Sequence, residues 1–349
     1  MKKLIQQICT NLNDGEDLVL VTVSSRSGST PRQAGAKMIV RRDGRIAGTI
    51  GGGLVEKEAV GEAEKCFADG HSKRSAFDLS GKDAAANDMI CGGRLELFLE
   101  FIQADEDNRA VFQALGAAVA AGRRVTLVCP LDTHGGALRF VIDHQGRTSH
   151  GDVPEGLLTA VRQVRSSTSG CTMVEHQGRE YLVSYFSVGG KLFLVGAGHV
   201  AACTAEAAGR VGFHVIVMDD RGEFANRDRF PLVDEIKVLP SFADCFSEYA
   251  IDEDCYLVIV TRGHLFDQVV LEQALRTRAG YIGMIGSRKK RNAIYANLLA
   301  QGVKEPQLER VHCPIGIAIE ADTPEEIAVS IVGELVYRRA TGRQAWHLI

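Results

Sequence analysis

The sequence predicts an α/β protein in which an N-terminal α+β domain precedes a C-terminal doubly wound parallel sheet. From residue 191 onward, short apolar runs alternate with helical stretches, which is typical of parallel strands covered on both faces. Before residue 186, strand-like runs are joined instead by short turns such as Asp43-Gly44, which is typical of antiparallel hairpins. The segment SVGG at 187–190 separates the two patterns, so we expect domains at residues 1–188 and 189–349.

The composition is that of an ordinary globular protein, and it excludes several classes of function. A chain of 349 residues with 45% hydrophobic content has room for two domains with sizeable cores. With a net charge of −4, the sequence lacks the excess of basic residues that is typical of nucleic-acid-binding proteins. No apolar run approaches the roughly 18 residues that cross a bilayer, and the N-terminal segment lacks the apolar core of a signal peptide. Nine cysteines without CxxC pairs indicate reduced thiols, so we expect a cytoplasmic protein.

The first domain begins with an amphipathic helix at residues 2–13, followed by a β-rich run at 18–23. That run leads into a loop, residues 24–36, which holds hydroxyl side chains, glycines, one proline and two arginines. Such a loop can donate backbone, hydroxyl and guanidinium hydrogen bonds to an anion, although serine, glycine and proline also form plain connecting loops. The candidate ligand-binding residues here are Ser29, Thr30 and Arg32.

A run of three glycines follows the next hairpin, whose strands are expected at 37–42 and 45–50. Gly51, Gly52 and Gly53 lead into a helix that contains Glu56 near its start. Because glycine costs chain entropy, three in succession indicate that the backbone comes close to something. That partner is either a ligand, most simply a phosphate on the helix N-terminus, or the strand against which the helix packs tightly.

Cys91 is the cysteine that we predict to be reactive or to bind a metal. It stands in the sequence MICGG, at the end of a loop between expected strands at 75–79 and 94–101. A cysteine followed by two glycines is expected to be accessible, and exposure near backbone N–H groups favours the thiolate. Cys129, Cys203 and Cys255 are expected to be small buried residues instead. We therefore assign Cys91 as the candidate catalytic and metal-ligating residue.

The rest of the first domain is expected to contain two more helices, at 108–121 and 154–164, with strands around them. A strand is expected at 124–130, and hairpins at 138–149 and 172–185. The histidines at 134, 144, 150 and 176 lie near turns without ligand spacing, so we interpret them as solvated residues rather than a metal site.

The second domain opens with a complete strand–turn–helix–strand unit at 191–221, which predicts a Rossmann-like fold. In its GAGHVA turn, the first glycine allows the tight turn and the second lets a pyrophosphate approach the backbone at a helix N-terminus. An acid about 20 residues later can bind a ribose hydroxyl. A nucleotide-type fold that binds no nucleotide is the alternative. The candidate residues are Gly196, Gly198, His199 and Asp219.

Further strands are expected at 235–239, 256–260 and 281–285, and they continue the sheet. The second of these is followed by Arg262 and His264, and the third by Ser287 and Arg288. Open α/β sheets bind ligands at these carboxyl ends. Ser287 suits a helix N-cap, and the basic run at 288–291 either favours a phosphate or forms a solvated face. A last helix is expected from residue 323 to about 339, with proline in its first turn.

Taken together, these motifs resemble those of the XdhC/CoxI family, accessory proteins for molybdenum hydroxylases such as xanthine dehydrogenase. In the first domain the resemblance rests on GSTPR at 28–32, GTIGGG at 48–53 with Glu56, and CGG at 91–93. In the second it rests on GAGHVA at 196–201, DDR at 219–221, TRGH at 261–264, GMIGSR at 283–288, PIG at 314–316 and TPEEIA at 323–328. It covers nearly the whole chain.

The resemblance implies a protein that binds molybdenum cofactor, protects it while a terminal oxo group is exchanged for sulfur, and delivers it to the apo-hydroxylase. It also implies a cysteine desulfurase as the sulfur source and a homodimer. Glycine-rich turns suit the phosphate of the pterin, and a soft thiolate such as that of Cys91 suits molybdenum or a sulfur intermediate. We expect a cofactor-binding chaperone rather than a turnover enzyme.

Two other functions stay open. The first is an NAD(P)-dependent oxidoreductase built on the second domain, for which the sequence shows no nucleophile–base pair of recognised spacing. The second is a purely structural assembly factor, which would bind no small molecule.

Overall fold

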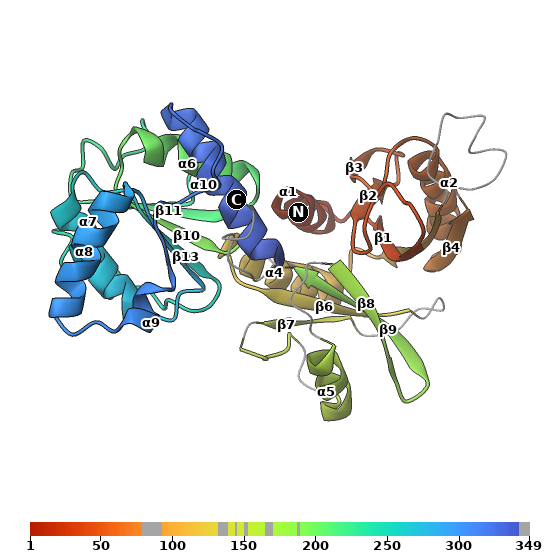
Figure 1. Ribbon diagram of the computed structural model, residues 1–349. Helices are drawn as coiled ribbons and strands as arrows, with labels where there is room; N and C mark the ends of the chain where they lie inside the picture. The colour runs from red at the N-terminus through yellow and green to blue at the C-terminus, as the bar shows by residue number, and fades with distance from the viewer. Residues whose placement is uncertain are drawn as a thin grey trace. The chain divides into compact units, whose positions relative to one another are not determined.

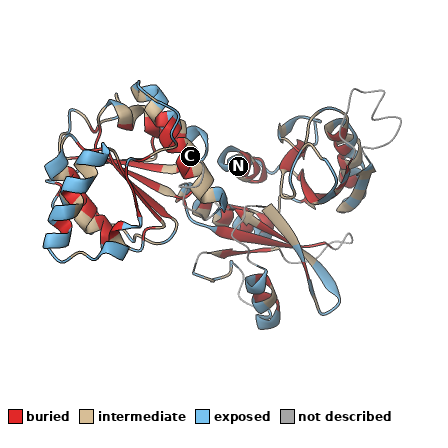
Figure 2. Cartoon of the chain, viewed as in Figure 1, coloured by how far each residue is buried: buried red, intermediate tan, exposed pale blue. Residues whose placement is uncertain are grey.

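The computed structural model describes residues 1–78, 93–131, 139–143, 145–149, 153–164, 170–186 and 189–341. The chain divides into two compact units, residues 1–187 and 188–349 (Figure 1). The described residues form two sheets in the first unit and one in the second. Figure 2 shows buried residues along the strands and on the helix faces that cover them.

An antiparallel five-stranded sheet with strand order β3-β2-β1-β5-β4 forms the first part of the N-terminal unit. Its strands are β1 (Leu18–Ser27), β2 (Lys37–Arg41), β3 (Ile46–Gly48), β4 (Lys73–Asp78) and β5 (Arg94–Ile102). The helices beside it are α1 (Lys2–Asn13), α2 (Gly53–Asp69) and α4 (Glu106–Ala120), of which α2 packs on β1 and β5 and α1 packs on α4. The expected helix at 2–13 and the expected hairpin at 37–50 are confirmed.

Strand β1 is longer than the apolar run that predicted it. It continues to Ser27 because its end pairs with the start of β5, beyond a register shift between Val23 and Ser25. In this register Ser27 lies opposite Arg94. The pairing therefore brings the loop after β1 to the beginning of β5.

A second antiparallel sheet, with order β7-β6-β9-β8, completes the N-terminal unit. Its elements are β6 (Val125–Pro130), β7 (Phe140–Asp143), β8 (Gly170–His176) and β9 (Arg179–Phe186), with α5 (Glu155–Gln163) packed on β8. Gln177 and Gly178 join β8 to β9 with φ of 53° and 75°, the left-handed values that a tight hairpin turn requires. The buried Lys37 of β2 donates a 3.0 Å hydrogen bond to Ser184 of β9, so a polar contact links the two sheets.

The C-terminal unit contains a six-stranded parallel sheet with order β12-β11-β10-β13-β14-β15, which confirms the doubly wound α/β prediction. The chain enters at β10, runs outward to β12, and then crosses back to β13, so the strand order reverses between β10 and β13. The strands are β10 (Lys191–Val195), β11 (His214–Asp219), β12 (Glu235–Val238), β13 (Cys255–Ile259), β14 (Tyr281–Met284) and β15 (Val311–His312).

Helices cover both faces of this sheet because successive residues of each strand point to opposite faces. Phe193 and Val195 pack with α7 and α8, whereas Leu192 and Leu194 pack with α6 and α10. The helices are α6 (His199–Arg210), α7 (His264–Leu275), α8 (Arg288–Ala300), the short α9 (Glu305–Leu308) and α10 (Pro324–Thr341).

The predicted starts of two of these helices are confirmed. The hydroxyl of Ser287 accepts the N–H of Lys290 at 3.2 Å and caps α8. Thr323 and Glu326 form reciprocal hydrogen bonds of 3.2 and 3.1 Å at the start of α10.

Candidate functional site

The glycine motifs of the N-terminal unit come together around the loop at 28–32. A Cβ on Gly93 would stand 2.5 Å from the carbonyl oxygens of both Ser27 and Ser29. A Cβ on Gly51 would stand 2.8 Å from the Cγ of Pro31. Real Cβ atoms essentially never come this close to another heavy atom, so both contacts require glycine. The loop is therefore packed directly against both the glycine turn and the start of β5.

The glycine turn before α2 is filled by a side chain of the same chain. One carboxylate oxygen of Glu56 accepts hydrogen bonds from the Thr49 hydroxyl at 2.5 Å and from the backbone N–H of Gly52 at 2.9 Å and of Ile50 at 3.2 Å. Gly51, Gly52 and Gly53 all have positive φ, which aims these N–H groups at one point. No described atom lies within 4 Å of a Cβ on Gly52, so the outer side of the turn is open.

Glu56 is held in its ionised form by these contacts. Partial burial acts to raise the pKa of its carboxyl, but the hydrogen bonds from Thr49 and from the backbone of Gly52, Ile50 and Gly51 together bring the pKa below its ordinary value. The turn therefore carries a negative charge of its own at the positive end of α2.

Three exposed arginines, Arg26, Arg32 and Arg94, lie in or beside the loop. No ion pair within 4 Å joins any of them to an acid among the described residues, although Asp78 lies opposite Arg94 where β4 pairs with β5. Within the loop, the Thr30 hydroxyl donates a 3.0 Å hydrogen bond to the Arg32 carbonyl, which fixes the backbone there. Arg94 is a residue that motif reasoning missed, although it directly follows the CGG motif. Three guanidinium groups without a described acidic partner suit an anionic ligand.

Cys91 lies outside the described residues, so the structure neither places its thiol nor shows its neighbours. The eight described cysteines are free, and burial raises the pKa of each, to about 11 for Cys66 and Cys313 and to about 12 for Cys245 and Cys255. Cys129 and Cys255 are buried as expected, but Cys203 is only partly buried. No cluster of metal-binding side chains occurs in the described parts of the chain.

In the C-terminal unit, the two glycines of the first turn have different surroundings. Gly196 has φ of +115°, and a Cβ there would overlap the carbonyl of Val260, so the packing of the turn on β13 itself demands glycine. At Gly198 no described atom lies within 4 Å of a Cβ. His199 follows as the exposed first residue of α6. The open approach to the helix N-terminus is thus at the second glycine.

Asp219 is buried at the end of β11, and the chain itself occupies its carboxylate. One oxygen accepts the backbone N–H of Ala197 at 2.8 Å and the Arg221 guanidinium at 3.1 Å. The other oxygen accepts two hydrogen bonds from Arg221, at 2.9 and 3.1 Å. In this structure Asp219 holds the GAGHVA turn by accepting the N–H of Ala197. Its contact with a ribose stays a prediction.

Arg262 pairs with the neighbouring acid. It forms a two-pronged ion pair with Asp220, one arm of which measures 2.8 Å, and its guanidinium lies 4.2 Å from the centre of the Phe266 ring. The hydrogen bond from Arg262 lowers the pKa of the Asp220 carboxyl. Because Asp220 follows β11 and Arg262 follows β13, the pair bridges the carboxyl ends of strands on either side of β10. His264 lies exposed at the start of α7.

Asp267 links the loop after β13 to helix α8. It is buried, accepts the Thr261 hydroxyl at 2.6 Å and forms an ion pair with Lys290 of α8. The loop after β13 is thus tied to the start of the basic run.

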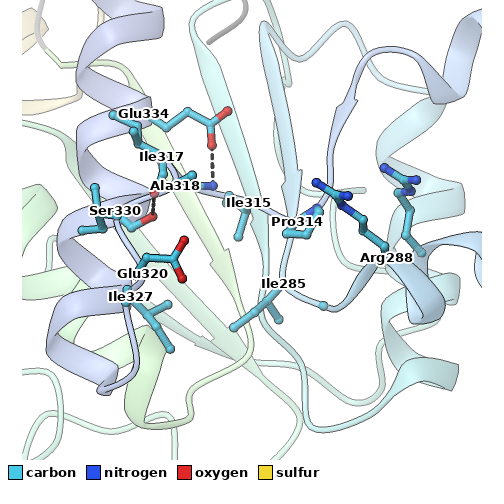
Figure 3. Close-up of a pocket in the computed structure, with 15 residues that line it drawn as sticks. Ile285, Arg288, Pro314, Ile315, Ile317, Ala318, Glu320, Ile327, Ser330 and Glu334 are labelled. Carbon is cyan, nitrogen blue, oxygen red and sulfur yellow. Dashed lines mark hydrogen bonds between the residues drawn. The ribbon is translucent and has the colours of Figure 1, made fainter. Parts of the chain in front are cut away.

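A pocket of about 630 Å³ opens at the carboxyl ends of β14 and β15 (Figure 3). Apolar walls come from Ile285, Ile315 and Ile327, while Arg288 stands on one side and Glu320 on the other. Of the site residues expected from the sequence, Arg288 lines this pocket and Ser287 caps the helix that bears it. The motif PIG at 314–316, which the sequence analysis quoted, also lines the pocket, whereas Glu320 on the loop that follows was not among the expected site residues.

Hydrogen bonds fix that loop to α10. The buried Glu334 accepts the backbone N–H of Gly316 and is also hydrogen-bonded to His312. The Ser330 hydroxyl donates to the carbonyl of Ile317 at 2.6 Å. This wall of the pocket is therefore preformed.

Family models match both units. Residues 192–335 match the XdhC Rossmann domain, and residues 12–78 match the XdhC and CoxI family. The chain is 27% identical to a Bacillus subtilis protein described as a probable xanthine dehydrogenase subunit (94% of this chain and 95% of that protein). It is 23% identical to the "Molybdenum cofactor insertion chaperone PaoD" of Escherichia coli (93% and 84%).

Two further matches extend over most of the chain. Escherichia coli YqeB, an uncharacterised protein, is 26% identical over 90% of this chain, which spans only 42% of its length. A crystal structure described as a xanthine dehydrogenase from Bacillus halodurans has a TM-score of 0.78 and 26% identity, and the match covers 98% of this chain and 97% of that one.

Proposed function

The chain belongs to the XdhC and CoxI family, and on that premise we propose that it is an accessory protein that binds molybdenum cofactor, supports its sulfuration and delivers it to a molybdenum hydroxylase such as xanthine dehydrogenase. Two relatives support this accessory role, one named as a molybdenum cofactor insertion chaperone and the other as part of a probable xanthine dehydrogenase. The cofactor is the cargo in this proposal, and the protein acts by binding rather than by turnover.

The observation that carries the proposal is the convergence at the loop of residues 28–32. Gly51 packs on Pro31 of this loop and Gly93 packs on Ser29, and exposed arginines lie in the loop and on the strands that flank it. The pterin carries a phosphate and a dithiolene, which are anionic groups that guanidinium and backbone N–H donors bind well. The residues present therefore fit an anionic cargo.

Each group has a distinct part in this proposal. Ser29 and Arg32 offer side-chain donors on the loop. Thr30 fixes the loop backbone through its hydrogen bond to the Arg32 carbonyl, and Glu56 keeps the glycine turn in shape. Cys91 stands two residues before Gly93 in the sequence, and its thiolate is the soft ligand that molybdenum or a sulfur intermediate prefers. A cysteine desulfurase would supply the sulfur while the protein holds the cofactor. We also propose that the protein acts as a homodimer.

Replacement of Cys91 tests the proposal. The Cys91→Ala and Cys203→Ala variants are purified from cells that synthesise molybdopterin, and molybdenum and pterin are measured per chain. We expect Cys91→Ala to lose most of its molybdenum, and Cys203→Ala, which changes a thiol with a raised pKa, to keep it. Equal molybdenum and pterin contents in both variants would show that Cys91 is not a ligand of the cofactor.

A further inference from the structure

The pocket at the ends of β14 and β15 has two charged side chains without partners on its facing sides. Arg288 and Glu320 are exposed, and neither makes a hydrogen bond or ion pair with a described residue. Figure 3 shows Arg288 on α8 and Glu320 on the loop that leads to α10. A ligand that bound between them would need an anionic group at one end and N–H donors at the other.

The space between these charges is lined by apolar side chains and is large enough for a fused ring. Ile285, Ile315 and Ile327 line it, and a volume of about 630 Å³ lies in the range of small-molecule sites. The wall is preformed, because Gly316 is bonded to Glu334 and because a Cβ on Gly316 would overlap the Ser330 hydroxyl. A ring could therefore enter without rearranging the loop at 315–317.

The first turn of α8 is unusually charged for the start of a helix. It reads Arg288-Lys289-Lys290-Arg291 and contains no acid, although the N-terminal end of a helix dipole repels cations. Lys290 pairs with Asp267, and Arg291 donates to the Cys313 carbonyl at 3.1 Å, so these two are used in packing. Arg288 has no such use among the described residues, and it is the cation of this turn that lines the pocket without another partner. A phosphate bound at the N-terminus of α8 would offset the repulsion between these cations and the helix dipole.

Glu320 is held in an uncommon backbone conformation. Its φ of 54° lies in the left-handed region, which residues other than glycine rarely adopt. The other such residue in the described chain, Gln177, is explained by its hairpin turn. At Glu320 no turn of that kind is present, and the conformation places a carboxylate at the pocket (Figure 3). A carboxylate accepts two neighbouring N–H groups well.

From these contacts we propose that the pocket binds a fused ring with a 2-amino-4-oxopyrimidine edge and a phosphate, the chemistry shared by pterin and guanine nucleotides. Glu320 accepts the amino and ring N–H groups of that edge, the isoleucines enclose the ring, and Arg288 binds the phosphate at the start of α8. The inference goes beyond the proposed function, because it assigns a second ligand site, which lies within the C-terminal unit alone.

Calorimetric titration of the full chain with four probes tests this assignment. The probes are neopterin monophosphate, guanosine monophosphate, adenosine monophosphate and inorganic phosphate. We expect the two probes with the 2-amino-4-oxo edge to bind at least about tenfold more tightly than adenosine monophosphate, which lacks that edge. The tighter of the two identifies the natural source, pterin or guanine.

Two variants and two matched controls locate the binding. Glu320→Gln should weaken the favoured probes about tenfold and remove their advantage over adenosine monophosphate, and Arg288→Ala should weaken phosphorylated probes about tenfold but leave unphosphorylated neopterin unchanged. Lys289→Ala and Asp322→Asn, which change neighbouring residues outside the pocket lining, should bind as the unaltered chain does. Equal affinity for all nucleotides, unchanged affinity in both variants, or no saturable binding of any probe would overturn the assignment.

The failure of this inference is distinguishable from failure of the proposed function. If the unaltered chain carries molybdenum and pterin but none of the probes shows binding that Arg288→Ala or Glu320→Gln weakens, the pocket assignment is wrong and the accessory function stands. If the unaltered chain carries neither, the proposed function is contradicted, while the probe titrations still decide what the pocket binds.

Discussion

The carboxylate of Glu56 accepts the backbone N–H of Gly52 at 2.9 Å, and through this contact the first turn of α2 closes on the glycine turn that precedes it. The same oxygen also accepts the Thr49 hydroxyl at the end of β3. The strand, the turn and the helix are thus joined at one atom. The loop at 28–32 packs on the outside of this joint through Pro31.

Removal of that carboxylate should loosen the turn. In Glu56→Ala, the N–H groups of Ile50 and Gly52 lose their acceptor, which costs about 1–2 kcal/mol at a helix start. We expect amide exchange at residues 50–53 to accelerate about tenfold or more, measured by hydrogen–deuterium exchange. Glu58→Ala, an exposed position on the same helix, should leave these amides unchanged. Equal acceleration in both variants would contradict the role of Glu56.

Acid should loosen the same turn. Because the folded pKa of Glu56 lies below its ordinary value of 4.5, its contribution is fully present above that value and is lost as the pH falls through the folded pKa. Exchange at residues 50–53, corrected for intrinsic rates, should therefore accelerate in this acid range. The acceleration should be absent in Glu56→Gln, whose side chain does not titrate there. The same acid response in both proteins would exclude Glu56 as its source.

Much of the C-terminal unit follows from local sequence, because each strand of a parallel sheet is a short apolar run next to its own helix. In contrast, the pairing of β1 with β5 joins residues more than 60 positions apart, and no local pattern reports it. Strand β15 has only two residues, too few for any periodicity. Glu56 was recognised as part of a motif, but its filling of the glycine turn depends on backbone angles at three glycines. No sequence pattern indicated that Glu320 would line a pocket, because its position depends on the fold of the loop around it.

A methyl group at Gly93 should disturb the loop above it. The Cβ of Gly93→Ala would meet the carbonyl oxygens of Ser27 and Ser29 at 2.5 Å, and overpacking of this kind costs about 1–3 kcal/mol. We expect a lower melting temperature for the N-terminal unit in differential scanning calorimetry. The control is Gly61→Ala within α2, where no described atom lies within 4 Å of the new Cβ, and which should stabilise the helix by about 0.5–1 kcal/mol. A Gly93 variant as stable as the control would show that the loop can move aside.

Lys37 should make the stability of the N-terminal unit depend on pH in the alkaline range. Burial lowers the pKa of its amino group below the ordinary value of 10.5, although the nearby Cys171, Glu100 and Cys129 act in the opposite direction. Between the lowered pKa and 10.5, the unfolded chain binds more protons than the folded one, so this group makes stability rise with pH, by at most about 1.4 kcal/mol per pH unit.

The Lys37→Met variant isolates this effect. Urea unfolding of the N-terminal unit is compared for both proteins between about pH 8 and about pH 10, below the unfolded pKa of lysine. We expect the difference in stability between unaltered protein and variant to shift toward the unaltered protein as pH rises. A difference that is constant with pH would show that Lys37 does not titrate in this window.

Asp219 should stabilise the C-terminal unit. Asp219→Ala leaves the Ala197 N–H and the Arg221 guanidinium without their buried acceptor, which costs about 2–4 kcal/mol. Thermal unfolding of the C-terminal unit should shift downward, whereas Asp228→Ala, an exposed acid in the same unit, should change little. An unchanged transition would mean that these hydrogen bonds are readily replaced by water.

Titration with NADH separates the accessory function from the oxidoreductase alternative. We expect no tight binding with substrate-dependent turnover, because the chain itself occupies the carboxylate of Asp219. Tight binding of NADH accompanied by oxidation in the presence of a substrate would support the oxidoreductase instead.

The most direct test measures the cargo itself. The protein is purified from cells that synthesise molybdopterin and from matched cells that do not, and molybdenum and oxidised pterin are quantified per chain. We expect nearly stoichiometric molybdenum and pterin in the first preparation and background amounts in the second. Background amounts of both in the two preparations would show that the protein does not hold molybdenum cofactor.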